Sequence, residues 1–172
     1  RCRFLGINQQ QRGITPNRCP ESLFMHDITI LTLVPSNCDR LPKCLASVHW
    51  ADRLFCVVDA RAPEEAAALA RTFTDWVVVH EYENAAAQRN WALPQINTEW
   101  TLVLDADEWI SEPLAERLKK IVAASGSADG YSILRHSFFL GKLIRHCGWH
   151  HDYNLRLFRT CKGRYLNRRV HS

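Results

Sequence analysis

The sequence predicts an α/β protein in which helices flank a mostly parallel sheet, followed by a mixed, more irregular C-terminal half. Between residues 28 and 126, short apolar runs alternate four times with segments whose apolar residues recur at helical spacing. Such alternation predicts parallel strands joined by right-handed crossovers. After Gly130, three apolar runs follow without helical segments between them. No repeat or linker divides the chain, so we expect one domain, residues 28–172, preceded by an irregular leader, residues 1–27.

The strands are predicted from short runs rich in β-branched residues. The first run, residues 28–34, is broken by Pro35. Two later runs end in an acidic residue, Asp59 in one and Asp105 in the other. We expect strands at residues 28–34, 54–58, 76–79 and 101–104, and further strands at residues 131–140, 142–147 and 153–160.

The helices are predicted from apolar spacing and from the residues at their ends. Pro42 lies in the first turn of the first helix, where its missing N–H costs no hydrogen bond. Pro94 ends the third helix, and Ser111 caps the fourth, which ends at Gly126. We expect helices at residues 39–48, 63–73, 84–93 and 111–126.

The leader and the cysteines give weaker indications. Residues 1–27 contain three consecutive Gln and several Gly and Pro without a sustained period, which predicts irregular structure. The seven cysteines form no Cys-x-x-Cys pair, and several, such as Cys56, lie in apolar runs. This pattern favours reduced, mostly buried thiols and a cytoplasmic setting. No run approaches the roughly 20 apolar residues of a membrane span.

Positive charge is concentrated near the C-terminus. The net charge is +4, but residues 131–172 hold nine Lys and Arg against a single acid, Asp152. Such a basic part suits an anionic ligand, and the alternatives are a solvated face or peripheral contact with an anionic membrane. The aromatic residues are not arranged as stacking platforms, so we expect no nucleic-acid partner.

Acidic residues follow the fourth predicted strand. Asp105 and Asp107 are two positions apart, so in an extended chain both point the same way. They would lie at the carboxyl edge of the sheet, where open α/β sheets bind ligands. Two oxygen ligands suit Mg²⁺ or Mn²⁺, and such a cation suits a phosphate-bearing substrate. The alternative is an acidic turn that caps the next helix.

Several motifs occur together in order. With them the sequence resembles the inverting GT-A glycosyltransferases of family two, and most closely their branch of lipopolysaccharide core glycosyltransferases, which add glucose. The motifs are the strand at residues 28–34, Val57-Val-Asp59, Ala87-Gln-Arg-Asn-Trp-Ala-Leu93, Leu104-Asp-Ala-Asp-Glu108, Gly148-Trp-His-His-Asp-Tyr-Asn-Leu-Arg-Leu-Phe-Arg159 and Arg169-Val-His171.

The resemblance implies a GT-A (Rossmann-like) fold and a sugar-transfer reaction. The donor would be a nucleoside-diphosphate sugar, with UDP-glucose expected, and the acceptor a hydroxyl of a saccharide or lipid-linked molecule, such as lipopolysaccharide core. A divalent cation, Mn²⁺ or Mg²⁺, would stabilise the charge of the leaving diphosphate. The reaction would take place in the cytoplasm, at the inner face of the membrane for a lipid-linked acceptor.

The same resemblance assigns metal ligands. Asp107 would bind the metal directly, and Asp105 would contact the metal or the ribose. His171 would be a late metal ligand, with a surface histidine as the alternative. A zinc site at residues 146–151 is disfavoured, because structural zinc sites draw ligands from two separated pairs.

Asp59 and three residues of one predicted helix would also bind the donor. Asp59 would hold the nucleoside, and its alternative role is to cap the next helix. Gln88, Arg89 and Asn90 share one predicted helix, where Arg89 would reach a phosphate and Asn90 would bond the donor. The alternative for these three is a solvated helix face.

An inverting transfer needs a base to take the proton of the acceptor hydroxyl. Asp152 is the candidate, and its alternative is an ion pair with Arg156, four residues on. Arg156 is a further candidate for the phosphates. Arg156 and Arg159 are three positions apart, so on a strand their side chains do not share a face, and at most one of them should face the site.

Two segments depart from the family pattern. Residues 33–38, after the first strand, and residues 60–64, after Asp59, differ from the segments that line the nucleotide pocket in the family. The alternative function is therefore a non-catalytic GT-A-like domain that serves binding or assembly. A nucleotidyltransferase is disfavoured, because it would need a Gly-rich basic loop where Pro35-Ser36-Asn37 stands.

Overall fold

The computed structural model describes residues 2–8, 27–36, 39–124, 126–140, 142–144 and 152–166. Its strands are β1 (Cys2–Asn8), β2 (Ile28–Val34), β3 (Arg53–Asp59), β4 (Val77–His80), β5 (Trp100–Asp105), β6 (Gly130–Phe139), β7 (Lys142–Leu143) and β8 (Tyr153–Arg159). Its helices are α1 (Leu41–Ala46), α2 (Glu64–Arg71), α3 (Ala85–Ala92) and α4 (Glu112–Ala123), with short 3₁₀ helices η1 (Leu93–Gln95) and η3 (Thr160–Lys162).

All described strands belong to one sheet. The order is β1-β6-β8-β5-β2-β3-β4, and the short β7 pairs with β6. Strands β5, β2, β3 and β4 are parallel, whereas β8 is antiparallel to both β5 and β6. The predicted division into a parallel half and a mixed half is therefore confirmed.

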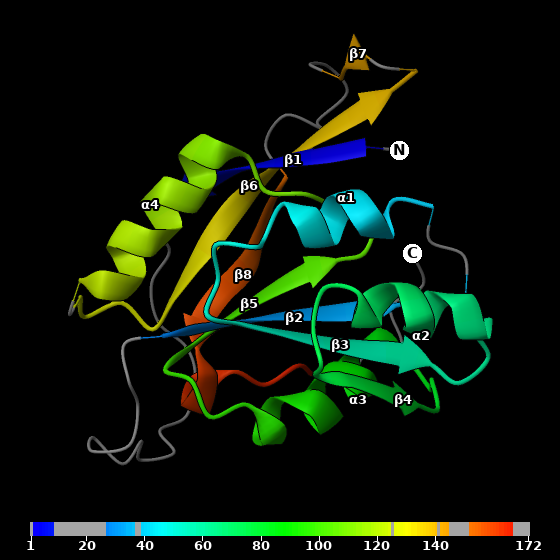
Figure 1. Cartoon of the computed structure of the whole chain (residues 1–172). Coiled ribbons are helices and arrows are strands. Elements are labelled where there is room, and N and C mark those ends of the chain that lie inside the picture. Colours follow the sequence, from blue (N-terminus) through cyan, green and yellow to red (C-terminus); the bar gives the residue numbers. More distant parts are fainter. Residues whose placement is uncertain are drawn as a thin grey trace.

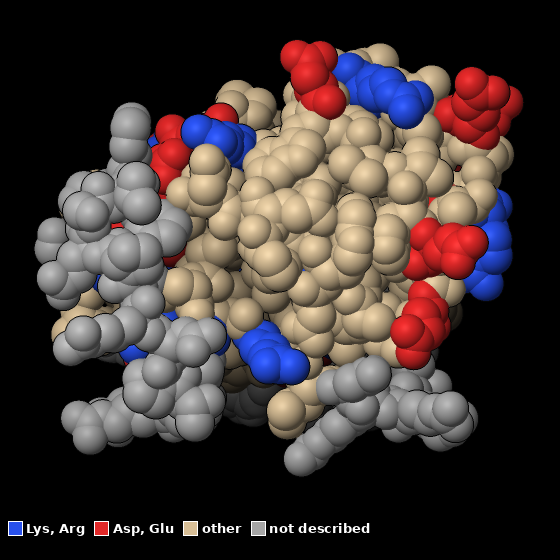
Figure 2. All heavy atoms as spheres, turned by 90° about the horizontal axis from the view of Figure 1, so that it is seen from below, with Lys and Arg blue, Asp and Glu red and all other residues tan. Residues whose placement is uncertain are grey.

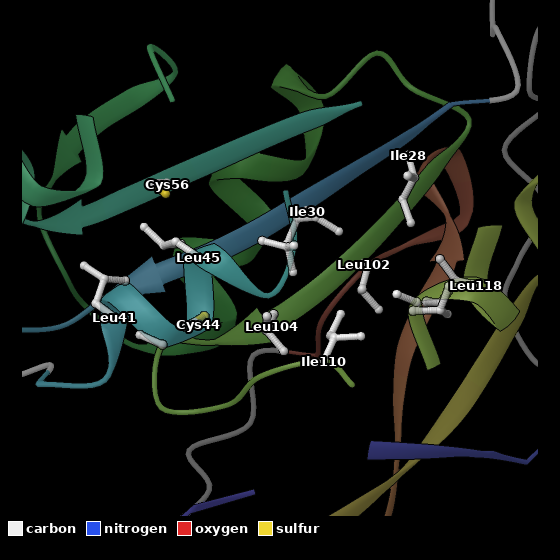
Figure 3. Packing of buried hydrophobic residues seen from close by; sticks show 14 of the residues in the cluster. Ile28, Ile30, Leu41, Cys44, Leu45, Cys56, Leu102, Leu104, Ile110 and Leu118 are labelled. Carbon is white, nitrogen blue, oxygen red and sulfur yellow. The ribbon is translucent and has the colours of Figure 1, made fainter. Parts of the chain in front are cut away.

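Helices cover both faces of the sheet (Figure 1). Consecutive residues of β2 point to opposite faces of the sheet. Ile30 packs with residues of α1, α2 and α4, whereas Leu31 packs with α3 and η1. Figure 3 shows the first of these clusters, where Leu45 of α1 lies over Ile30 and Leu118 of α4 lies near Leu102. On the opposite side, the surface over α3 carries few charged side chains (Figure 2). This two-sided burial explains why the parallel strands are almost continuously apolar.

The predicted helix ends hold at two positions where a side chain caps the backbone. Asn84 accepts a hydrogen bond from the N–H of Ala87, and Ser111 accepts one from Leu114. Each satisfies an N–H that has no partner within its helix. The first and second helices are shorter than predicted, because apolar spacing does not fix a helix end where no side chain caps it.

Two expectations about the ends of the chain and the cysteines are corrected. Residues 2–8 form β1, antiparallel to β6, instead of irregular structure. This pairing joins segments more than a hundred residues apart, which local periodicity does not reveal. Cys44 and Cys56 are free and buried, as expected, and burial raises the pKa of Cys56 to about 12. Cys161, however, is disulfide-bonded.

The disulfide weakens the argument from the cysteines for a cytoplasmic setting, since disulfides persist in oxidising compartments. Within the described ranges, no helix has the length and apolar character needed to cross a bilayer.

Candidate functional site

A pocket of about 670 Å³ opens at the carboxyl ends of the parallel strands. Ligands bind at this edge in open α/β sheets, because the loops that follow the strands converge there. The segment after β2 contributes Pro35 and Ser36, and α3 contributes Ala85. Five of the predicted site residues also line the pocket: Asp59, Gln88, Arg89, Asp105 and Asp107.

Asp59 ends β3 and is held by Arg61. The backbone N–H, Nε and Nη2 of Arg61 all donate to the Asp59 carboxylate, at 2.9, 3.1 and 2.8 Å. These hydrogen bonds hold the pKa of Asp59 below its usual value. The N-cap of α2 is Pro63, with no side-chain hydrogen bond. The alternative in which Asp59 caps the next helix is therefore wrong, and its carboxylate stays beside the pocket.

Helix α3 presents Gln88 and Arg89 to the pocket. Gln88 is almost fully buried, and its Nε2 lies 3.5 Å from the carbonyl of His80. Its buried Oε1 has no hydrogen-bond partner among the described residues. Arg89 Nη2 donates to Asp105 Oδ1 at 2.6 Å, and its guanidinium lies over the ring of Tyr165. The solvated-face alternative is therefore wrong for these two residues.

Acidic and basic side chains alternate from the pocket towards β6. Arg156 Nη2 donates to Asp105 at 2.7 Å and to Glu108 at 2.9 Å. Arg135 Nη1 lies 3.6 Å from Glu108, and its Nε donates to Asp152 at 2.7 Å. We call this series the ion-pair chain: Arg89, Asp105, Arg156, Glu108, Arg135 and Asp152.

The middle of the ion-pair chain is deeply buried. The Glu108 side chain is 0% exposed and that of Arg156 is 7% exposed. Burial raises the pKa of Glu108, while Arg156 and Arg135 oppose this effect. Burial alone would lower the pKa of Arg156, but Asp105 and Glu108 outweigh it and raise that pKa. Glu108 is therefore a buried carboxylate that forms ion pairs with the guanidinium groups of both Arg156 and Arg135.

The structure also separates the roles of the acids and arginines near the C-terminus. Asp152 accepts hydrogen bonds from Arg135 and from Asn154, so the expected alternative, a pair with Arg156, is wrong. Arg159 instead pairs with Glu99 and lies over the ring of Trp100. Of the two arginines on β8, only Arg156 faces the pocket side, which agrees with the expectation from strand alternation.

Asn90 is not among the residues that line the pocket. Its Nδ2 donates to the carbonyl of Tyr165 at 2.7 Å, and its Oδ1 accepts from the Tyr165 N–H at 2.8 Å. Both ends of the amide are therefore used to fasten the segment after η3 to α3. The side chain completes a backbone contact 75 residues away, and the donor-binding role of Asn90 stays a prediction.

We expect Asn90→Ala to lower the free energy of unfolding by about 1 to 3 kcal/mol, because it leaves the part-buried Tyr165 backbone groups without partners. Urea denaturation measures this change. Asn97→Ala is the matched control, since Asn97 is exposed and bonds only Arg53 in the described structure. If Asn90→Ala kept full stability but bound nucleotide more weakly, the result would support the donor-binding role of Asn90 instead.

The carboxylates of Asp105 and Asp107 are the candidate ligands for a divalent cation. Asp107 is exposed on the pocket wall and makes no ion pair with any described residue. The described residues contain no group of three His, Cys, Asp or Glu side chains that could hold a metal. One or two carboxylates fit Mg²⁺ or Mn²⁺ when substrate phosphates complete the coordination. His171 and residues 146–151 lie outside the described residues.

Comparison with known proteins gives a matching family and, among curated proteins, the following relative. The sequence profile described as "Glycosyl transferase family 2" matches residues 35–169. The relative is the lipopolysaccharide core biosynthesis glycosyltransferase LpsC of Rhizobium meliloti (strain 1021), 32% identical over 137 residues. The match covers 76% of this chain and 50% of LpsC, so the chain spans about half the length of that relative.

Solved structures show more distant similarity. S. aureus TarS 1-349 matches with a TM-score of 0.45 and 20% identity, over 56% of this chain and 31% of that one. The bifunctional IspDF from Campylobacter jejuni matches with a TM-score of 0.43 and 13% identity, over 78% and 41% respectively. These scores are too low to support an inference about function.

Proposed function

The chain belongs to glycosyl transferase family 2, and from this premise we propose that it transfers a sugar from a nucleoside diphosphate to an acceptor hydroxyl with inversion. We propose a UDP-sugar, UDP-glucose first, as the donor. The observation that carries the proposal is the pocket at the carboxyl edge of the sheet, where Asp59, Arg89, Asp105 and Asp107 come together.

We assign roles in donor binding to five pocket residues and to the adjoining Arg156. Asp59 suits the hydroxyl and amide donors of a nucleoside, while Arg89 and Arg156 supply positive charge for the diphosphate. Gln88 offers its unpartnered Oε1. Asp107 and Asp105 would hold a divalent cation, Mn²⁺ or Mg²⁺, which when bound neutralises charge on the leaving diphosphate. His171 stays a predicted further ligand.

Asp152 is the proposed base. Its carboxylate accepts hydrogen bonds from Arg135 and Asn154, which orient it. In the transfer, Asp152 accepts the proton of the acceptor hydroxyl as the hydroxyl oxygen attacks the sugar carbon and the bond to the diphosphate breaks. The arrangement supports this role because the ion-pair chain leads from Asp152 to Asp105 in the donor pocket.

The acceptor is proposed from the relative and from charge. LpsC is named for lipopolysaccharide core biosynthesis, so we propose a saccharide or lipid-linked acceptor of that kind. The basic residues after Gly130 suit an anionic acceptor and peripheral contact with a membrane. We propose the cytoplasmic face as the location, and the redox state of Cys161 in the isolated protein tests it, since a persistent disulfide argues for an oxidising compartment.

Calorimetric titration tests the donor site. We expect UDP and UDP-glucose to bind with micromolar affinity in Mn²⁺, and EDTA or Asp107→Ala to weaken binding more than about tenfold by removing the cation or its ligand. Asp75→Ala is the control, because it removes the same charge from an exposed position outside this pocket.

Failure of every nucleoside diphosphate to bind the wild type would contradict the enzyme proposal. It would favour the alternative, a GT-A-like domain for binding or assembly within a larger protein. One observation favours this alternative. Arg89 and Arg156 each donate a hydrogen bond to Asp105, so both oxygens of a candidate metal ligand are already engaged.

A further inference from the structure

We propose that Arg89 and Arg156 compete with a divalent cation for Asp105, so that the pocket takes the cation together with a diphosphate and binds it weakly alone. This inference rests on the proposed function, because it concerns how the same pocket is loaded. It assigns Arg89 a second role besides phosphate binding: the counter-ion of Asp105 before the donor arrives.

The geometry at Asp105 carries the first step. Its Oδ1 accepts from Arg89 at 2.6 Å and its Oδ2 accepts from Arg156 at 2.7 Å, which are short, charge-assisted hydrogen bonds. The two arginines come from different elements, α3 and β8, and each donates to a different oxygen of the carboxylate. A cation that binds Asp105 must displace one guanidinium or lie close to both, and like charges at such distances repel strongly in a partly buried site.

The surroundings decide which arginine moves. Arg156 is also bonded to the buried Glu108 and keeps that partner if it loses Asp105. Arg89 pairs with Asp105 alone among the described acids, and its buried Nε has no hydrogen-bond partner there. Arg89 also lines the pocket, so it can leave Asp105 and donate to a phosphate oxygen. We therefore assign the exchange to Arg89 and the fixed position to Arg156.

A diphosphate removes the conflict between the two cations. Its oxygen atoms supply negative charge to Arg89 and complete the coordination of a cation at Asp107 and Asp105. Binding of the nucleotide and of the cation should then be mutually reinforcing, and by linkage each raises the affinity for the other by the same factor.

Binding of Mn²⁺ without nucleotide tests this competition. Free Mn²⁺ is measured by electron paramagnetic resonance in titrations of the wild type, Arg89→Gln and Arg61→Gln. We expect Arg89→Gln to bind Mn²⁺ roughly tenfold more tightly, because it removes one of the two guanidinium groups that donate to Asp105. Adding Asp105→Asn to Arg89→Gln should abolish the gain.

Arg61→Gln is the matched control. Arg61 lines the same pocket and carries the same charge, but it pairs with Asp59 instead of Asp105. Its loss lowers the positive charge of the pocket without freeing Asp105, so we expect less than about a twofold change in Mn²⁺ affinity, since the side chain is exposed and screened. Equal gains in both variants would overturn the inference, because net charge alone would then explain them.

The nucleotide titration should show the opposite sign. In saturating Mn²⁺, Arg89→Gln should bind UDP roughly tenfold more weakly than the wild type, since the phosphate loses a charged donor. Unchanged or weaker Mn²⁺ binding by Arg89→Gln overturns the inference whatever UDP does. Absence of UDP binding by the wild type contradicts the proposed function only, because the Mn²⁺ comparison needs no nucleotide.

Circular dichroism and thermal unfolding check that the variants are folded. If Arg89→Gln unfolds, Arg89→Lys serves in its place: it keeps the charge but lacks the fork that reaches both Asp105 and the ring of Tyr165. We expect a smaller gain in Mn²⁺ affinity from Arg89→Lys, with the same sign. No gain from a folded Arg89→Lys would overturn the inference.

Discussion

Glu108→Gln should lower the free energy of unfolding by about 3 to 5 kcal/mol, because removing one member of a buried ion pair leaves its partners uncompensated. Glu108 is fully buried and holds Arg156 at 2.9 Å and Arg135 at 3.6 Å. Gln keeps the size of the side chain but removes the charge that both guanidinium groups face. Urea denaturation at neutral pH measures the loss as a shift of the midpoint.

The control is Glu116→Gln in the exposed face of α4. Glu116 pairs with Lys119 at 2.8 Å, one turn away, and both side chains are largely exposed. Exposed pairs of this kind contribute little to stability, so the same substitution should have little effect there. A loss below about 1 kcal/mol for Glu108→Gln would show that Asp105 and Asp152 suffice to compensate the two arginines.

The parallel half of the fold could be predicted because its signals are local. The β-branched run of β2 and the capping side chains of Asn84 and Ser111 act within a few residues of the structure that they determine. The position of the pocket followed from the same reasoning. Asp59 ends β3 and Asp105 ends β5, and these are the two parallel strands that flank β2.

The partners of the charged residues could not be predicted in this way. Arg156 contacts Asp105 across 51 positions, and Arg135 reaches Asp152 from another strand. Sequence reasoning considered Asp152 with Arg156 because they are close in sequence, although β8 directs Arg156 elsewhere. It also assigned no role to Glu108, whose only signal was its place directly behind the two predicted metal ligands.

Long-range pairing also explains what local reasoning missed at Asn90 and at β1. Asn90 bonds the backbone of Tyr165, and β1 pairs with β6. Neighbouring side chains of one helix therefore have different surroundings. Gln88 and Arg89 line the pocket, while the adjacent Asn90 fastens the backbone.

Asp152→Asn should lower the turnover of UDP-glucose by at least about a hundredfold, because the amide cannot accept the proton of the attacking hydroxyl. The affinity for UDP with Mn²⁺ should change less than about twofold, since among the described residues Asp152 is linked to the donor pocket through Arg135, Glu108 and Arg156. UDP release in the presence of a lipopolysaccharide-core saccharide measures turnover, and calorimetry measures the affinity.

The two readouts separate a base from a structural acid. Asp129→Asn is the matched control, because Asp129 pairs with Lys162 at the surface, and we expect its turnover to be that of the wild type. If Asp152→Asn lost UDP affinity and turnover in equal measure, Asp152 would act by holding Arg135 and, through it, the donor pocket. If turnover alone were lost, Asp152 would act as the base, oriented by Arg135 in the ion-pair chain that also contains Asp105.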